Sequence, residues 1–331
     1  MRIAALASAL LFCAALARGD ETGEVVIYSG RSKSLVAPLV RTIQKDTGIK
    51  VTVRYGKTAG LALLLQEEGK KSPADLFWAQ DAGALSMLAK KGMFRRLSGP
   101  EVQRVPPEFR GDGLTWVATS GRARVLAYST KRVRAADLPR TVFDLTDAKW
   151  RNRVGWAPTN GSFQAFVSAM RGKYGDERTR KWLLAMKANG TKAYPKNTPI
   201  LQAIAAGEID LGLPNHYYLL RFKTADKKFP VAQTAFGDGD VGNLVNVAGV
   251  GMLESAPHPR AAARVVAYLL AAKAQQYFTS SIFEYPVLDD VIPNAMLLDL
   301  DTLRRKSAGI DLATLHDLEG TLKLLREVGL L

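Results

Sequence analysis

Short apolar runs and amphipathic stretches alternate along the first part of the chain. The predicted elements are strands at 25–28, 49–54 and 74–78 and helices at about 32–45, 58–68 and 82–91. Strands that alternate with helices at this spacing predict βαβ units around a parallel sheet. Ligands of such open sheets bind beyond the carboxyl ends of the strands. The corresponding loops are 29–32, 55–58 and 79–81, and their candidate cleft residues are Ser32, Tyr55, Thr58 and Gln80.

A second α/β region begins near residue 125. Its predicted strands lie at 154–156 and 209–213, and its polar loop 158–162 leads into a helix; further helices are predicted at about 177–188 and 196–205. Residues 244–253 are apolar and β-rich, a run long enough to pass from one domain back into the other. The chain from residue 259 onward is predicted to be mostly helical.

The pattern predicts an α/β fold of two lobes, each with a mixed sheet flanked by helices, joined by hinge strands. We expect the first lobe to contain residues 24–124 and about 248–297. The second lobe would contain about 125–247 and 298–331. A cleft between two such lobes can close on a small ligand.

The first 17 residues have the features of an export signal. Arg2 gives a positive start, residues 3–16 form a mainly apolar run, and a small-x-small pattern predicts cleavage after Ala17. Cys13, the only cysteine, lies inside this segment. Lipid anchoring through Cys13 is the alternative, although Phe12 is bulky for such a site. The mature chain would lack cysteine, which excludes disulfides and cysteine-based metal sites.

The chain of 331 residues carries a net charge of +15 at pH 7. Its lysines and arginines form short, scattered clusters without the interleaved aromatic residues of a single-strand binder. Because the signal directs the protein out of the cytoplasm, we expect no nucleic-acid partner. A solvated basic surface that attracts anionic ligands accounts for the charge. No segment after the signal has the uninterrupted apolar length of a membrane span.

Tyr217 and Tyr218 are the first candidates for a binding function. They follow the apolar run 209–213 and a break at Pro214, where a helical pattern begins. Neighbours in a strand point to opposite faces, whereas neighbours in a helix diverge by only about 100°. Both phenol oxygens could then face one cleft, and a phenolate is a hard oxygen ligand suited to a hard trivalent ion. The alternative is a pair of half-buried aromatic residues that fix a helix to a sheet.

Several segments together resemble one known family. They are residues 26–31, 46–51, 67–78, 156–163, 196–198, 207–211, 215–218 and 284–286. In this order they resemble the periplasmic ferric-ion-binding subunits of bacterial ABC importers, the transferrin-like solute-binding proteins. The resemblance covers nearly the whole mature chain. It implies the type II periplasmic-binding-protein fold.

The resemblance implies that Tyr217 and Tyr218 are the principal iron ligands. Three supplementary ligands of the family are missing. Ser32 stands where many members have histidine, Gln80 where these members have glutamate, and Phe163 where other members have a third tyrosine. Whether Tyr55 or Gln80 of the first lobe reaches the metal is left open.

Arg31 matches the position of an arginine that holds a synergistic anion in the members without histidine. A guanidinium fork matches the planar oxygens of an anion such as carbonate. In related members the anion side of the cleft also includes the residues that match Thr159, Asn160, Gly161, Ser162, Asn197 and Asn215. The alternatives are a surface salt bridge for Arg31 and helix caps for the two asparagines.

The sequence therefore predicts a periplasmic, monomeric protein that binds Fe³⁺ with carbonate, or with phosphate as the anion. It would deliver the iron to an inner-membrane ABC permease and its ATPase subunit. The first rival is a binding protein whose cargo is an anion itself, namely a phosphate, phosphonate or sugar phosphate. Arg31, the positive charge and the missing iron ligands favour that rival.

The second rival, an enzyme, has little support in the sequence. Residues 237–242 match a dinucleotide fingerprint, but they precede a predicted strand and not a helix. Asp238 and Asp240 begin like a calcium loop that lacks its closing glutamate. The three histidines lack metal-binding helical spacing, so we expect them to be surface or packing residues. There is no Gly-x-Ser-x-Gly nucleophile elbow.

Overall fold

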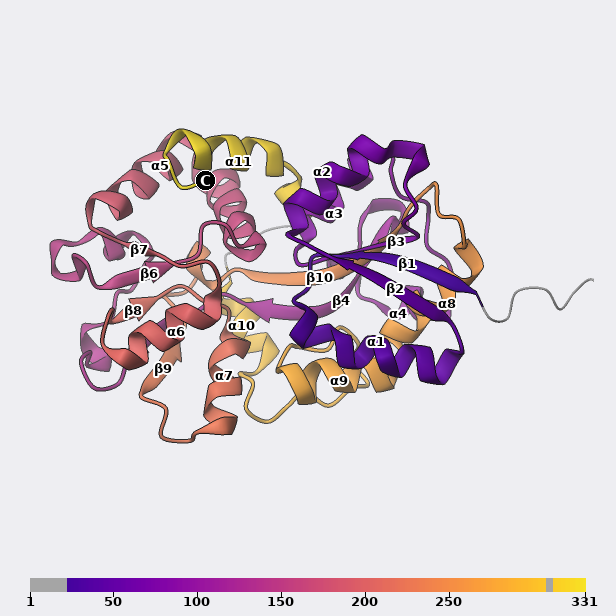
Figure 1. Ribbon diagram of the computed structural model, residues 1–331. Coiled ribbons are helices and arrows are strands. Elements are labelled where there is room, and N and C mark those ends of the chain that lie inside the picture. Colours follow the sequence, from indigo (N-terminus) through magenta and orange to yellow (C-terminus); the bar gives the residue numbers. More distant parts are fainter. Residues whose placement is uncertain (1–22, 308–311) are drawn as a thin grey trace, which may run out of the picture.

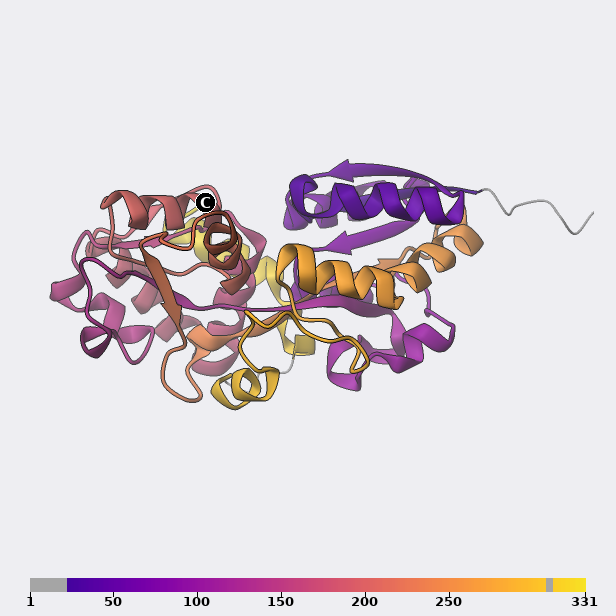
Figure 2. The ribbon, with the colours of Figure 1, turned by 90° about the horizontal axis from the view of Figure 1, so that it is seen from below.

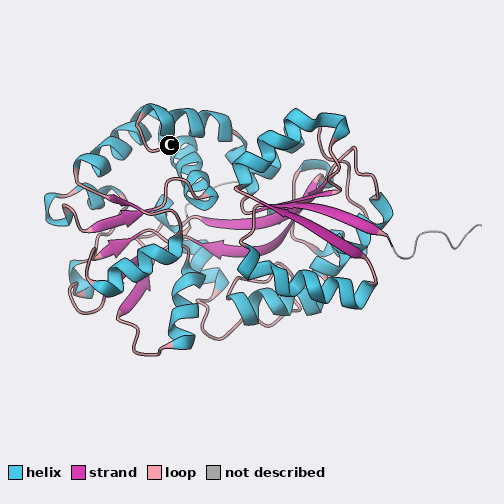
Figure 3. Ribbon diagram, viewed as in Figure 1, coloured by secondary structure: helices cyan, strands magenta, loops and turns pink. Residues whose placement is uncertain are grey.

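The computed structural model describes residues 23–307 and 312–331. The predicted signal segment 1–17, with Cys13 and the cleavage after Ala17, lies outside these residues. No helix within the described ranges is long and apolar enough to cross a membrane. The described chain forms two halves (Figure 1), and each half has a sheet with helices around it (Figure 3).

The first lobe is built on a five-stranded sheet with the order β2-β1-β3-β10-β4. Strand β1 (Glu24–Ser29) pairs in parallel with β2 (Lys50–Tyr55) and β3 (Leu76–Ala79). Strand β10 (Val245–Met252) pairs antiparallel with β3 and with β4 (Trp116–Ala123). The βαβ pattern thus gives the parallel part of this sheet, and the two strands that lead to the other lobe make it mixed.

The second lobe is built on another five-stranded sheet, with the order β7-β6-β8-β5-β9. Strand β6 (Val154–Trp156) pairs in parallel with β7 (Lys192–Ala193) and β8 (Leu211–Gly212). Strand β5 (Leu126–Ser129) pairs antiparallel with β8 and with β9 (Val231–Thr234). Because β4 runs almost directly into β5, the chain crosses between the lobes there, and Figure 2 shows this crossing beside β10.

The helices cover both sheets. In the first lobe, α1 and α9 lie on one side of the sheet and α2 and α3 on the other (Figure 1). In the second lobe α11 packs along α5. The helix bounds are α1 Lys33–Thr47, α2 Thr58–Glu68, α3 Ala82–Lys90, α4 Pro100–Arg104, α5 Gly161–Ala188, α6 Asn197–Ala206, α7 His216–Ala225, α8 Pro259–Leu270, α9 Ala272–Ile282, α10 Leu300–Lys306 and α11 Leu318–Glu327.

Local sequence signals set several of these helix ends. Asp81 caps α3 by accepting a hydrogen bond from the backbone N–H of Ala84 at 3.1 Å, and Asn160 caps α5 through the N–H of Ser162 at 3.0 Å. Gly48 ends α1 with φ of 72° and Gly207 ends α6 with φ of 89°. Glycine adopts this left-handed conformation without the steric cost of a Cβ atom.

The predicted α/β fold with two mixed sheets is confirmed. The elements of the first lobe begin and end within about two residues of their predicted positions. The helix predicted at 177–188 is the second half of the longer helix α5, which bends at Gly175 (φ 79°, ψ 164°). The strand predicted at 209–213 is shorter, since only Leu211 and Gly212 pair as β8.

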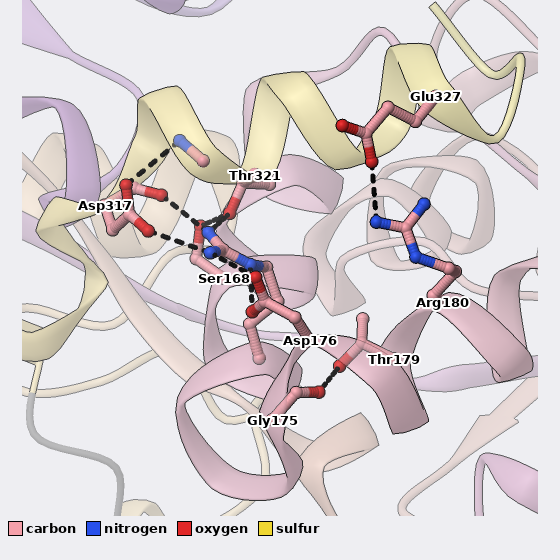
Figure 4. Close-up of polar contacts among 10 residues, drawn as sticks. Ser168, Gly175, Asp176, Thr179, Arg180, Asp317, Thr321 and Glu327 are labelled. Atoms are coloured by element: carbon pink, nitrogen blue, oxygen red, sulfur yellow. Dashed lines mark hydrogen bonds and ion pairs between the residues drawn. The ribbon is translucent and has the colours of Figure 1, made fainter.

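Polar contacts tie the C-terminal segment to α5. Figure 4 shows residues of α5 that face this segment, and the pairs are Ser168–Thr321 at 2.7 Å, Arg171–Asp317 at 2.8 Å and Arg180–Glu327 at 2.6 Å. Arg171 also binds Asp176 on its own helix at 2.8 Å, and its side chain is 11% exposed. Burial alone would lower the pKa of Arg171, but the two aspartates outweigh burial and raise it.

Replacing Arg171 with methionine should destabilise the protein by about 2–3 kcal/mol, because two aspartates lose their common partner in a partly buried site. The free energy of unfolding can be measured from urea titrations. Lys181→Met is the matched control on the same helix, since Lys181 pairs with Glu177 on an exposed surface. It should change stability by less than about 0.5 kcal/mol. Equal losses in the two variants would contradict the prediction.

Candidate functional site

A cavity of about 660 Å³ lies between the lobes. On the first lobe it is lined by the loops that follow β1, β2 and β3, which are the loops predicted from the strand ends. On the second lobe it is lined by the loops before α5 and α6 and by one side of α7. Of the predicted site residues, those that line it are Arg31, Ser32, Tyr55, Thr58, Gln80, Thr159, Asn160, Gly161 and Tyr218.

The tyrosine pair lies in the first turn of α7, as the helical pattern predicts. The two rings are close, with centroids 4.2 Å apart and planes inclined by 30°. Tyr218 lines the cavity, whereas Tyr217 is fully buried beside it. The side-chain amide of Gln80, from the opposite lobe, donates to the Tyr217 hydroxyl at 3.5 Å. The Tyr217 hydroxyl therefore points to the boundary between the lobes, and the pair is not merely apolar packing.

Burial raises the pKa of Tyr217 well above its ordinary value. The neighbouring Tyr218 and the carboxylate of Glu284 act in the same direction, whereas Arg31 and Arg122 oppose them. The phenol of Tyr217 is accordingly protonated at neutral pH when the cleft is empty. A cation that binds there must displace this proton.

Arg31 is buried, so the alternative of a surface salt bridge is wrong. Its guanidinium pairs with Glu284 at 2.7 Å, and both side chains are fully inaccessible to solvent. It also donates to Oε1 of Gln80 at 3.3 Å, while its Nε has no hydrogen-bond partner among the described residues. Ser120 of β4 donates to the same Glu284 oxygen at 2.5 Å. Glu284 thus links Arg31 to a strand that leads to the second lobe.

Two further arginines are buried where β4 passes into the second lobe. None of the three guanidinium nitrogens of Arg122 has a hydrogen-bond partner among the described residues. Burial lowers the pKa of Arg122, and Tyr217 and Glu284 oppose this most strongly, with a smaller effect from Asp81. Arg124 donates to the carbonyl of Leu213 at 2.5 Å, and burial lowers its pKa to about 9. Together with Arg31, these arginines outnumber the two buried carboxylates near them, Glu284 and Asp81.

Neither Asn197 nor Asn215 caps a helix through its side chain, which corrects that alternative. Asn197 is the first residue of α6, and neither of its side-chain polar atoms has a partner among the described residues. Asn215 precedes α7 but makes no capping hydrogen bond through its side chain, and its Nδ2 is also unpartnered there. Both side chains are buried and, like Ser162, lie outside the cavity lining. Asn160 is the residue of this set that caps a helix.

The replaced ligand positions have clear structural roles. Phe163 is fully buried and packs its ring against Trp156 and Phe166, with the Arg124 guanidinium 5.6 Å from the ring centroid. Gln80 and Ser32 line the cavity but have no acidic or imidazole group to offer. Within residues 23–307 and 312–331, no group of three or more histidine, cysteine, aspartate or glutamate side chains could hold a metal.

The two lobes touch at Gly161. A Cβ atom on Gly161 would lie 3.0 Å from Oδ2 of Asp81 and 3.6 Å from the side chain of Thr58. Thr58 itself accepts a hydrogen bond from the backbone N–H of Gln80 at 3.3 Å. The absence of a side chain on Gly161 therefore permits the second-lobe loop to approach the strand ends of the first lobe.

The residues that the sequence analysis considered for an enzyme have other roles. His216 is buried. Its Nδ1 accepts a hydrogen bond from the backbone N–H of Ala123 at 3.1 Å, and its Nε2 lies 2.8 Å from the backbone carbonyl oxygen of Phe283, which confirms it as a packing residue. Burial lowers its pKa to about 4. Asp240 caps a short turn through the N–H of Gly242, and Asp238 pairs with Lys306. The segment around them is a loop before β10, as predicted.

The sequence did not single out Arg122, Arg124 or Glu284 by their chemistry. A signal for the arginines is present in the sequence. Arg122 and Arg124 lie at the end of the largely apolar segment that begins at Trp116. Glu284 gives no such signal, because it follows α9 in an irregular segment more than 250 positions from Arg31. Only the fold brings these groups together.

The chain matches the family model described as bacterial extracellular solute-binding protein over residues 71–302. It is 31% identical to an Fe(3+)-binding periplasmic protein of Serratia marcescens, with 99% of this chain and 97% of that protein covered. It is 32% identical to a major ferric iron-binding protein of Neisseria meningitidis serogroup B, with 97% and 98% covered.

A solved structure gives the same result for the fold. Iron-bound HitA from Pseudomonas aeruginosa superposes with a TM-score of 0.87 at 32% identity, covering 92% of this chain and 99% of that one. The two lobes, the strand-end cleft and the near full-length similarity therefore agree. The chain belongs to the family of bacterial extracellular solute-binding proteins, and its full-length relatives include ferric-iron-binding proteins.

Proposed function

We propose that the protein binds ferric iron between its lobes through the phenolate oxygens of Tyr217 and Tyr218, together with an anion such as carbonate. The observation that carries this proposal is the tyrosine pair itself, which lies at the cavity boundary next to buried arginines. The ferric-iron-binding relatives agree with this cargo. Their family is one of solute-binding proteins and not a class of enzymes.

The buried charges explain why an anion accompanies the metal. Two phenolates leave a ferric ion with uncompensated positive charge, and the surroundings already contain three buried arginines, Arg31, Arg122 and Arg124, against two buried carboxylates, Glu284 and Asp81. Uncompensated buried charge of one sign is costly in a protein interior. An anion bound with the iron makes the whole assembly negative, so that the same arginines stabilise it. Phosphate could replace carbonate in this role.

We assign the anion side of the cleft to Arg31 and to the loop Thr159, Asn160, Gly161 and Ser162. The loop leads into α5, where Asn160 accepts hydrogen bonds from the backbone N–H groups of Ser162, Phe163 and Gln164, so an anion would have to displace the Asn160 side chain from Ser162 or bind the N–H of Gly161. Asn197 and Asn215 would contribute their unpartnered amide groups once the lobes rearrange around a ligand. Tyr55, Thr58, Ser32 and Gln80 form the first-lobe wall.

Binding and release follow from the proton balance at the tyrosines. The metal displaces the phenol protons, because its charge stabilises the phenolates more than burial destabilises them. Acid or loss of the anion would therefore favour release. The loaded protein, exported by its signal and monomeric, would dock on an inner-membrane ABC permease whose ATPase subunit drives import.

Changing Tyr217 or Tyr218 to phenylalanine should lower the affinity for ferric iron by more than about 100-fold and abolish the visible phenolate–iron absorption in the double variant. The fold should survive, since only hydroxyl groups are lost. Tyr174→Phe is the matched control. Tyr174 belongs to α5, packs against Phe143 and does not line the cavity. Iron binding by the double variant with the wild-type stoichiometry and colour would refute the proposed ligands.

Changing Arg122 to methionine should leave the empty protein as stable as the wild type or stabilise it by about 1–4 kcal/mol, because an unpartnered buried cation is removed. The same change should weaken the binding of ferric iron with bicarbonate by about 10- to 100-fold. Urea unfolding and competition titrations measure the two effects. Lys228→Met, at an exposed lysine, is the control. A variant that binds iron as tightly as the wild type would show that Arg122 is not part of the charge balance.

The affinity for iron should fall as the pH falls, by about tenfold per pH unit for each phenol proton displaced. The sign follows from the raised pKa of Tyr217: the empty site is protonated, and the bound site is not. Competition titrations between about pH 5 and 7, corrected for the protonation of the competing chelator, measure this slope. Tyr217→Phe should reduce the slope by about one proton. A slope that is the same in the variant would contradict the assignment.

A further inference from the structure

Glu284 is a fully buried carboxylate that lies behind the cavity and is not part of its lining. It follows α9 in an irregular segment that is fixed on strand β4. Its backbone N–H donates to the carbonyl of Phe278 at 3.0 Å, and the next residue, Tyr285, exchanges two backbone hydrogen bonds of 2.8 Å with Gly121 of β4. The position of Glu284 is therefore set by the strand that crosses between the lobes.

The residue before Glu284 has a strained backbone. Phe283 ends α9 with φ of 60° and ψ of 32°, a left-handed conformation that is uncommon for a residue other than glycine. Such strain persists where the surrounding structure holds it, often at functional sites. Here the Phe283 carbonyl oxygen lies 2.8 Å from Nε2 of His216, and the turn leads directly to the buried side chain of Glu284.

The ion pair between Glu284 and Arg31 is only half made. Nη2 of Arg31 donates to Oε2 of Glu284 at 2.7 Å, and Ser120 donates to the same oxygen at 2.5 Å. Oε1 of Glu284 and Nε of Arg31 are buried, and neither has a hydrogen-bond partner among the described residues. A guanidinium and a carboxylate commonly make two parallel hydrogen bonds. This pair therefore leaves one buried donor and one buried acceptor unsatisfied, which is costly.

Arg31 stands between the buried carboxylate and the cavity. It lines the cavity, and its Nη1 donates at 3.3 Å to Gln80, which also lines it. Burial by itself would lower the pKa of Arg31, but the charge of Glu284 acts in the opposite direction and the pKa is raised. An oxyanion that enters the cavity thus meets a guanidinium that already holds a negative charge. Two anions on one guanidinium repel each other strongly in a protein interior.

We propose that Glu284 is an internal competitor of the anion for Arg31, and that it thereby sets the concentration and the kind of anion with which the site loads iron. This inference rests on the proposed function and specifies how its anion is selected. In the empty protein Glu284 takes the place of the anion as the partner of Arg31. Glu284 acts through Arg31 and is not itself a ligand of the iron.

The competition favours anions that carry more than one charge. A monoanion such as formate offers Arg31 no more charge than Glu284 already supplies. Carbonate or phosphate brings a second charge and further oxygens, and these oxygens can accept from the unpartnered Nε of Arg31. The wild-type protein should therefore load iron with bicarbonate or phosphate and not with formate.

The first test replaces Glu284 with glutamine, which keeps the shape and can still accept a hydrogen bond from Ser120. Iron is presented as ferric nitrilotriacetate at a fixed concentration, and the phenolate–iron absorption is followed as bicarbonate or formate is added. The bicarbonate concentration for half-maximal colour should fall by about 10- to 100-fold, and formate should now support colour. Asp210→Asn is the matched control, because Asp210 pairs with Arg132 and Arg153 at 2.5 and 2.6 Å outside the cavity lining. It should keep the wild-type requirement.

The second test uses the metal-free protein. Glu284→Gln leaves Arg31 without its carboxylate and should lower the Tm by about 5–10 °C. Phosphate should restore most of this loss, relative to sodium chloride of equal ionic strength, because it binds only the folded state. Asp210→Asn should also lower the Tm, but phosphate should not restore it. A purely structural role for Glu284 would give the same response to phosphate in both variants.

If Glu284→Gln does not fold, the double variant Glu284→Gln/Arg122→Met removes one buried cation together with the carboxylate. It is compared with Arg122→Met alone, and the same fall in the bicarbonate requirement is expected. An unchanged or higher requirement in either comparison would overturn the inference, since Glu284 would then only support Arg31. Equal restoration of both glutamate and aspartate variants by phosphate would overturn it as well. If the wild type develops no colour with any anion, the proposed iron function fails, while the metal-free test still decides the role of Glu284.

Discussion

An excess of buried positive charge lies next to two phenols, and the rest of the site depends on it. Arg31, Arg122 and Arg124 are buried near two buried carboxylates, Glu284 and Asp81, and the guanidinium of Arg122 has no hydrogen-bond partner among the described residues. An interior of low dielectric constant makes such an imbalance expensive. The empty site therefore holds an excess of positive charge, which the net negative assembly of the proposed function would balance.

The fold brings this charge to the boundary of the lobes. Strand β4 belongs to the first sheet, and the chain continues from it into β5 of the second sheet, so Arg122 and Arg124 lie where the chain crosses. Glu284 connects Arg31 of the first lobe to Ser120 of that strand. The buried charges thus lie beside the segment that connects the two sheets, and a movement of one lobe against the other would bend this segment. The buried charges of the proposed site and the crossing between the lobes therefore involve the same residues, Arg122, Arg124 and Glu284.

Ser32, Gln80 and Phe163, which stand where the family resemblance implies metal ligands, also make the site depend on groups supplied by the ligand. Phe163 is fixed in an aromatic core with Trp156, and Gln80 is engaged by Arg31 and by the Tyr217 hydroxyl. A metal held here relies on oxygens that come with it. In the proposed function, these oxygens belong to the anion that binds together with the iron.

The sequence by itself determined the class of fold, most strands and helices, the loops that form the cleft and the tyrosine pair, because these follow from local periodicity and from strand-end rules. Only the tertiary structure decided the electrostatics. It showed that Arg31 is buried against Glu284, that the side chains of Asn197 and Asn215 make no capping hydrogen bond, and that the guanidinium of Arg122 has no hydrogen-bond partner among the described residues. Burial and ion pairing join residues that are far apart in the chain, so no local pattern can reveal whether a charge is solvated or left to be balanced by a ligand.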